Sequence, residues 1–356
     1  MRCTAKQRKA AQALFVAYLN QECQSLKRER RFGLACRTES VRNSFLDFLR
    51  SRGREDIRVC DLSASVVLDY QQWLIDRGVQ KNSSSCYIRT LQSIYNKHIA
   101  GLPGLPEKPF SKVYRGIAKT RKRAAGIALI QEICSLDIAQ GLIALGKSPE
   151  RKTFAMHLHR VTFARDLFVF CYCARGLSFV DAAYLKKTSL GNGIIRYQRC
   201  KTGQIIEVAV EPIMQDIIDR YAPQAQGTPY LFPILPLTDA ENTYIAYRSA
   251  LRSHNGYLKM VARMLGADVS LTSYVARHSW ASHMHDMNVP MAVISQGLGH
   301  GSELTTQIYI KSLESNVLYE ANRDLISRLL PVSPHDTDLL FNGSEKTLPS
   351  LCPEAG

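Results

Sequence analysis

The sequence lacks several features that mark common classes of protein. No apolar run approaches the roughly 18 residues that a membrane-spanning helix needs. The ten cysteines include no CxxC pair and are too sparse for a disulfide scaffold, so we expect a reducing, cytoplasmic compartment. The GxxxxGK(S/T) loop and the HExxH motif are also missing, which counts against ATP chemistry and zinc catalysis. We therefore expect no cofactor and no metal.

Acidic residues are in deficit. The chain holds 31 Asp and Glu against 46 Lys and Arg, which gives a formal net charge of +15. Such an excess favours a polyanionic partner, with nucleic acid first and an anionic membrane surface second. With 356 residues, 46% of them apolar and 22% charged, the chain has the composition of a globular protein and the length of two domains.

The positive charge is confined to the first third of the chain. Residues 1–123 contain 25 Lys and Arg but only 10 Asp and Glu, whereas residues 124–356 are neutral. A solvated basic face is the simpler explanation of a charge run. A whole domain at +15 beside a neutral one instead predicts a unit dedicated to binding phosphates.

Residues 1–123 are predicted to form a small helical bundle with a linker. Apolar residues recur at helical spacing, with helices expected over 38–53 and 63–78 and another starting near Ser83. Gly101 to Pro109 is expected to be a loop. The basic linker that follows is a candidate DNA contact, through Lys119, Arg121, Lys122 and Arg123.

The rest of the chain is predicted to mix helices with one β-hairpin. Two β-rich runs, 194–200 and 205–210, flank a turn that contains Lys201 and Gly203. We expect a mainly α fold with a small β-sheet: an α+β domain over 124–330 after the helical bundle, and a disordered tail over 331–356.

One stretch in the second domain resembles a known catalytic core. It contains Arg277-His278, then Leu298-Gly299-His300, then Thr306-Gln307-Ile308-Tyr309. In this order and near this spacing, the motifs resemble those of the tyrosine recombinase (phage integrase) family. The resemblance implies a SAM-like core-binding domain before residue 124 and a catalytic domain after it. It also implies double-stranded DNA as the partner.

The residue types suit the cleavage of a phosphodiester without a metal. The resemblance implies that Tyr309 is the nucleophile, a role in which a tyrosine can form a reversible covalent phosphoryl-enzyme. It implies that Arg277 neutralises the phosphate, that Lys201 protonates the leaving 5′-hydroxyl, and that His300 binds the phosphate and assists proton transfer. Each residue alone has a structural explanation, but the four together favour catalysis.

The chain departs from the family pattern at two positions. Tyr274 replaces the histidine usually found three residues before Arg277. The proton-transfer role of that histidine is either supplied by Tyr274, taken by another group, or dispensable. Ser178 occupies the place of the first arginine. Because residues three apart share a helix face, we expect Arg175 to supply that guanidinium, and Asp181 to orient the site.

The resemblance implies a site-specific DNA recombinase that acts through a 3′-phosphotyrosyl intermediate, as a homotetramer on synapsed DNA. The resemblance also implies accessory DNA-bending proteins and a bacterial, nucleoid-associated location. It implies no membrane partner. The segment 313–330 could pack on a neighbouring protomer or on its own domain. Two other functions remain open: a non-cleaving DNA-binding regulator derived from a recombinase, and a type IB-like topoisomerase.

Overall fold

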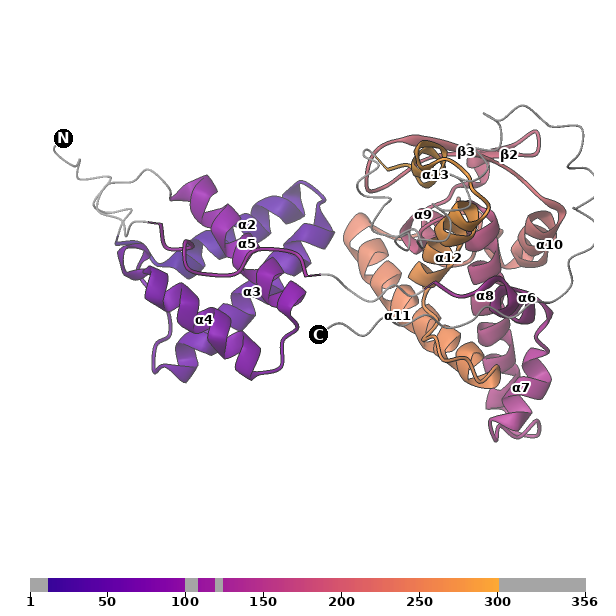
Figure 1. Ribbon diagram of the computed structural model, residues 1–356, viewed down its shortest axis with the longest axis horizontal. Coiled ribbons are helices and arrows are strands. Elements are labelled where there is room, and N and C mark those ends of the chain that lie inside the picture. Colours follow the sequence, from indigo (N-terminus) through magenta and orange to yellow (C-terminus); the bar gives the residue numbers. More distant parts are fainter. Residues whose placement is uncertain (1–11, 100–107, 119–123, 301–356) are drawn as a thin grey trace, which may run out of the picture. The chain divides into compact units, whose positions relative to one another are not determined.

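The computed structural model describes residues 12–99, 108–118 and 124–300. Tyr309, the basic linker, the segment 313–330 and the tail 331–356 lie outside the described residues. Within them the chain is mostly helical and has one three-stranded sheet, so the expected mainly α class with a small β-sheet is confirmed (Figure 1).

The basic third of the chain packs its helices around one aromatic and aliphatic core. The core includes Phe15, Phe45 and Tyr70, all fully buried, with the Phe45 and Tyr70 rings edge to face at 5.1 Å between centroids. Such contacts form because the apolar residues recur on one face of each helix. The helices are α2 (Phe15–Arg28), α3 (Phe32–Ser51), α4 (Ala64–Asp76) and α5 (Lys81–His98), with a short 3-10 turn η1 (Val59–Asp61).

Helix boundaries in this region follow the sequence signals only in part. The Oγ of Ser63 accepts a hydrogen bond from the backbone N–H of Val66 and caps α4, as predicted. The start expected near Thr38 is wrong, because α3 begins at Phe32 and Thr38 is buried within it. A threonine facing the core cannot satisfy the free N–H groups of a first turn.

A second, separate core extends from Ala125 to Ala276. Helix α8 (Thr153–Cys173) contacts α6, α7, α10, α11 and α12, and Figure 1 shows it passing behind α12. The remaining helices are α6 (Ile127–Ser135), α7 (Ile138–Ala144), α9 (Phe179–Ala183), α10 (Pro212–Tyr221), α11 (Ala240–Met264), α12 (Ser273–Asp286) and α13 (Met291–Leu298), with 3-10 turns η2 (Lys187–Ser189) and η3 (Pro223–Ala225).

The sheet contains the predicted hairpin. Strands β1 (Leu190–Gly191), β2 (Ile194–Gln198) and β3 (Ile205–Ala209) are antiparallel in the order β1-β2-β3. Residue Ile194 pairs with Ala209, and Gln198 pairs with Ile205. Odd-numbered residues of β2 face the core, which is the alternation that a sheet with one covered face requires.

The two large cores share no residue. The division into two domains, with a boundary at residue 124, stays a prediction, and residues 119–123 are outside the described ranges. Among the described residues, no single helix is long and apolar enough to cross a membrane.

Candidate active site

Arg277 is the centre of the candidate site. It lies in the second turn of α12, and only 1% of it is exposed. Its Nη1 donates to the carbonyl of Gly176 at 2.8 Å, and its Nη2 donates to the carbonyl of Leu298 at 2.5 Å. A buried guanidinium needs such acceptors to replace water, and these two hold its planar fork in one orientation.

His300 lies against this guanidinium. Helix α13 ends at Leu298. The φ of +62° at Gly299 turns the chain back, and the N–H of His300 donates to the carbonyl of Ser295 at 3.0 Å. The Nε2 of His300 lies 3.1 Å from Nη2 of Arg277. Arginine only donates, so Nε2 accepts and a neutral His300 carries its proton on Nδ1.

Burial and three cations keep His300 neutral. Burial is the largest cause, followed by the positive charges of Arg277, Arg199 and Lys201, and together they lower the pKa of His300 to about 4. The imidazole therefore enters a reaction at neutral pH as a donor through Nδ1 and an acceptor through Nε2.

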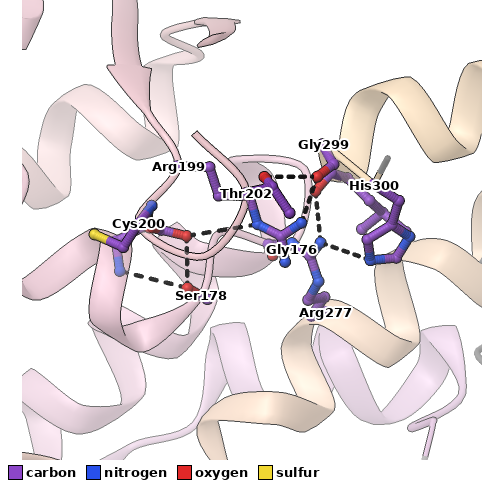
Figure 2. Close-up of polar contacts among 10 residues, drawn as sticks. Gly176, Ser178, Arg199, Cys200, Thr202, Arg277, Gly299 and His300 are labelled. Atoms are coloured by element: carbon purple, nitrogen blue, oxygen red, sulfur yellow. Dashed lines mark hydrogen bonds and ion pairs between the residues drawn. The ribbon is translucent and has the colours of Figure 1, made fainter. Parts of the chain in front are cut away.

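The tip of the β-hairpin is bonded to the same turn. Nη1 of Arg199 donates to the carbonyl of Gly299 at 2.5 Å, and Oγ1 of Thr202 donates to that carbonyl at 3.2 Å. Nε2 of Gln204 donates to the carbonyl of His300 at 3.4 Å. Figure 2 shows the contacts of Arg199 and Thr202 with Gly299. The exposed Lys201 is thereby held on a hairpin tip that is attached to the Arg277 and His300 cluster.

Asp181 fastens the other side of the hairpin. Its side chain is 1% exposed and accepts hydrogen bonds from Oγ of Ser178 at 2.6 Å and from the N–H of Cys200 at 2.8 Å. It also forms an ion pair with Arg199, with 3.9 Å between Nε and Oδ2. These contacts connect Asp181 to the hairpin beside Arg199, and its orienting role in catalysis stays a prediction. Ser178 caps α9, and its hydroxyl donates to the carboxylate of Asp181.

The helical spacing expected between Arg175 and Ser178 is wrong. Helix α8 ends at Cys173, and Arg175 has a φ of +56°, so the backbone leaves the helix before Ser178. Arg175 and Ser178 therefore share no helix face. Arg175 is exposed in the turn next to Gly176, and its catalytic role stays a prediction.

Tyr274 lies one turn before Arg277 on α12 and is 47% exposed. Its ring packs edge to face against His278, with 4.8 Å between centroids. The structure thus places Tyr274 on the helix that carries Arg277, where a substitute for the usual histidine would have to lie.

Sequence reasoning missed Arg199. The available signal was its register, because it continues the inward-facing series of Ile195 and Tyr197 along β2. An arginine at an inward position needs a buried partner, which makes it a candidate site residue. Metal ligands give no comparable signal: within the described ranges, no three His, Cys, Asp or Glu side chains gather as a metal site.

Two family models match the chain. The model for the phage integrase family matches residues 181–316, and the model for the phage integrase SAM-like domain matches residues 14–101. Together they span more than half of the chain, and the second one confirms the SAM-like fold expected before residue 124. The match to the first spans Arg199, Arg277 and His300.

Curated relatives and solved structures agree with these matches. Tyrosine recombinase XerD of Pseudomonas aeruginosa is 22% identical over 287 residues, covering 78% of this chain and 87% of the relative. XerD of Brucella suis is 32% identical over 95 residues, covering 27% of this chain and 28% of the relative.

Among solved structures, the Tn1549 transposon integrase in complex with transposon right end DNA has a TM-score of 0.56 at 12% identity, covering 89% of this chain and 99% of its own. A lambda integrase dimer bound to a COC′ core site has a TM-score of 0.54 at 13% identity, covering 83% and 95%. These likenesses show the fold. The matches do not favour the regulator or the topoisomerase, and the chain belongs to the phage integrase family as a tyrosine site-specific DNA recombinase.

Proposed function

We propose that Tyr309 attacks a DNA phosphodiester to form a 3′-phosphotyrosyl bond and release a 5′-hydroxyl, with Arg277, His300 and Lys201 acting on the same phosphate. The observation that carries this proposal is the buried cluster in which Arg277, His300 and the hairpin tip are bonded to one turn. A partner strand's 5′-hydroxyl then attacks the phosphotyrosyl bond, which rejoins the DNA and restores the Tyr309 hydroxyl.

Arg277 stabilises the charge that develops on the phosphate oxygens. Its guanidinium is held by two carbonyls before DNA arrives, so little reorganisation is needed at the moment of reaction. A fixed dipole or cation of this kind contributes about 10² to 10³ in rate.

His300 and Lys201 handle hydrogen bonds and protons. The neutral imidazole donates from Nδ1 to a phosphate oxygen, since Nε2 accepts from Arg277. The Lys201 ammonium donates a proton to the leaving 5′-oxygen. Tyr274, on the same helix as Arg277, would assist removal of the proton from the Tyr309 hydroxyl. Arg175 is the residue that the sequence suggests for a second guanidinium.

Double-stranded DNA is the proposed partner, bound through the basic first third of the chain and through Lys119, Arg121, Lys122 and Arg123. A lambda integrase has been solved as a tetramer bound to a Holliday junction, with a TM-score of 0.53 to this chain at 13% identity. We infer the same assembly here, a homotetramer on two synapsed duplexes in the bacterial cytoplasm, with DNA-bending proteins as accessory factors.

Covalent trapping tests the proposal. The chain is incubated with random-sequence duplexes that carry one nick, and DNA that stays attached to protein in detergent is recovered, amplified and sequenced. The nick lets the short released strand diffuse away, so the phosphotyrosyl adduct accumulates. The parent should give an adduct and Tyr309→Phe should give none, because phenylalanine has no nucleophilic oxygen.

A matched control is Tyr257→Phe, which removes a different hydroxyl, one that accepts a hydrogen bond from Arg160 at 3.3 Å. This variant should keep the adduct. Equal adduct from Tyr309→Phe and the parent would exclude Tyr309. A consensus sequence among the recovered DNA favours a recombinase. Adducts without a consensus sequence, together with relaxation of supercoiled plasmid, would favour a topoisomerase. The absence of any adduct would favour a regulator.

A further inference from the structure

The site has a cation that the family motifs do not explain. Ser178, at the place of the first arginine, carries no charge and is engaged with Asp181. We propose that Arg199 is a catalytic residue that binds a non-bridging oxygen of the scissile phosphate and supplies the second guanidinium. This inference rests on the proposed function and assigns a further residue to it.

Arg199 is buried and held in one orientation beside the Gly299 turn. The residue is 5% exposed, and its guanidinium reaches the Gly299 turn from the hairpin, while that of Arg277 reaches the preceding carbonyl from α12 (Figure 2). Successive carbonyls, those of Leu298 and Gly299, thus hold the two guanidinium groups beside His300. Two forks held in this way present fixed donors to one tetrahedral anion.

Arg199 also has donor capacity to spare. Its buried Nε has no hydrogen-bond partner among the described residues, and the nearest Asp181 oxygen is 3.9 Å away, which is beyond hydrogen-bond range. Leaving a buried charged donor unsatisfied is costly, so chains seldom keep one without a use. A phosphate oxygen arriving with DNA would be a partner for this Nε–H group.

Asp181 acts as the positioning residue for this guanidinium. It is bonded to the N–H of Cys200, the residue after Arg199, and so fixes the backbone from which the Arg199 side chain leaves. The Ser178 hydroxyl in turn holds the carboxylate. Ser178, at the first arginine position, therefore helps to position Arg199, the residue that replaces the missing arginine.

The charge of the phosphate provides the test. The substrates are two nicked duplexes of the sequence recovered with the parent, one with an ordinary scissile phosphate and one with a methylphosphonate, in which a methyl group replaces one charged oxygen. A cation that neutralises this oxygen matters for the first substrate and much less for the second. A residue with a merely structural role affects both substrates equally.

We expect Arg199→Ala to form adduct about 10² to 10³-fold more slowly than the parent on the phosphate. On the methylphosphonate the deficit should shrink to less than about tenfold. Arg199→Lys keeps the charge but not the planar fork, and should recover part of the rate on the phosphate. The control Arg196→Ala removes an exposed arginine of β2 that pairs with Glu207 at 3.2 Å, and should keep the parental rate on both substrates.

Three results would overturn the assignment: a parental rate for Arg199→Ala on the phosphate, an equal deficit on both substrates, or a charge-dependent deficit that belongs to Arg175→Ala alone. In each case the parent still forms its adduct through Tyr309 and the proposed function stands. Failure of the parent to form any adduct would instead refute the proposed function, and this assignment with it.

Discussion

Gly176 should tolerate no side chain, because its missing Cβ is what allows Arg277 to lie where it does. The φ of Gly176 is +69°, and a Cβ built there would lie 2.9 Å from Cα and 3.1 Å from Cγ of Arg277. The closest atom belongs to the backbone of α12, which cannot move aside as a flexible side chain could. The Gly176 carbonyl is also the acceptor for Nη1 of Arg277.

The expected magnitude for Gly176→Ala has two parts. The left-handed backbone conformation costs an alanine roughly 1–2 kcal/mol. The overlap with α12 adds about 1–3 kcal/mol, as overpacking of a filled core does. The free energy of unfolding should therefore fall by about 2–5 kcal/mol. The displaced Arg277 should slow adduct formation on the nicked duplex by about 100-fold, because misplacements near 1 Å have effects of that size.

Gly146→Ala is the matched control. Its φ is +76°, but a Cβ there would meet no atom within 4 Å, so only the conformational cost of roughly 1–2 kcal/mol applies. Urea unfolding measures both free energies and the trapping assay measures both rates. The reasoning is refuted if the two variants lose the same stability, or if Gly176→Ala keeps the parental rate of adduct formation.

Three further predictions concern pH, capping and salt. Burial lowers the pKa of His254 to about 3, so below its usual value near 6.5 the unfolded chain binds a proton that the folded chain does not. Lowering the pH from 7 to 5 should therefore cost about 2 kcal/mol of stability through this group, and urea unfolding of His254→Phe should show a correspondingly smaller pH dependence. Ser178→Ala removes the cap of α9 and a bond to Asp181, and should lower the unfolding free energy by about 1–2 kcal/mol, while a thermal melt identical to the parent's would argue against that cap. If about 6 to 10 phosphates are neutralised, DNA affinity should drop roughly 10³ to 10⁵-fold between 50 and 200 mM salt, and a flat titration would exclude phosphate-dominated binding.

Local signals in the sequence were sufficient where the structure is local. The cap at Ser63 and the turn around Gly203 depend on neighbours within a few residues, and both are where the sequence predicts them. The start of α3 was misplaced because Thr38 has the chemistry of a cap but faces the core. Whether a threonine caps or packs is decided by a helix elsewhere in the chain.

The candidate site was predictable as far as its motifs reach. Arg277 and His300 are 23 residues apart, both are proposed from the family pattern, and the structure places Nη2 and Nε2 of the two side chains 3.1 Å apart. Arg199 belongs to no quoted motif; its inward register hinted at a buried partner, but that partner, the Gly299 carbonyl, lies 100 residues later and is seen only in the structure. The helical spacing expected between Arg175 and Ser178 is wrong because α8 ends at Cys173, before both residues.

The Gly299 turn has a consequence for the chain during its own synthesis. Arg199 is synthesised 100 residues before the Gly299 carbonyl that holds it, and one of the two acceptors of Arg277, the Leu298 carbonyl, is added only one residue before Gly299. Because domains fold as the ribosome releases them, a chain still being translated has these cations without the turn that orients them. A polypeptide cut short before residue 298 therefore cannot assemble the phosphate-binding centre, so incomplete products could contact the genome but lack the means to nick it.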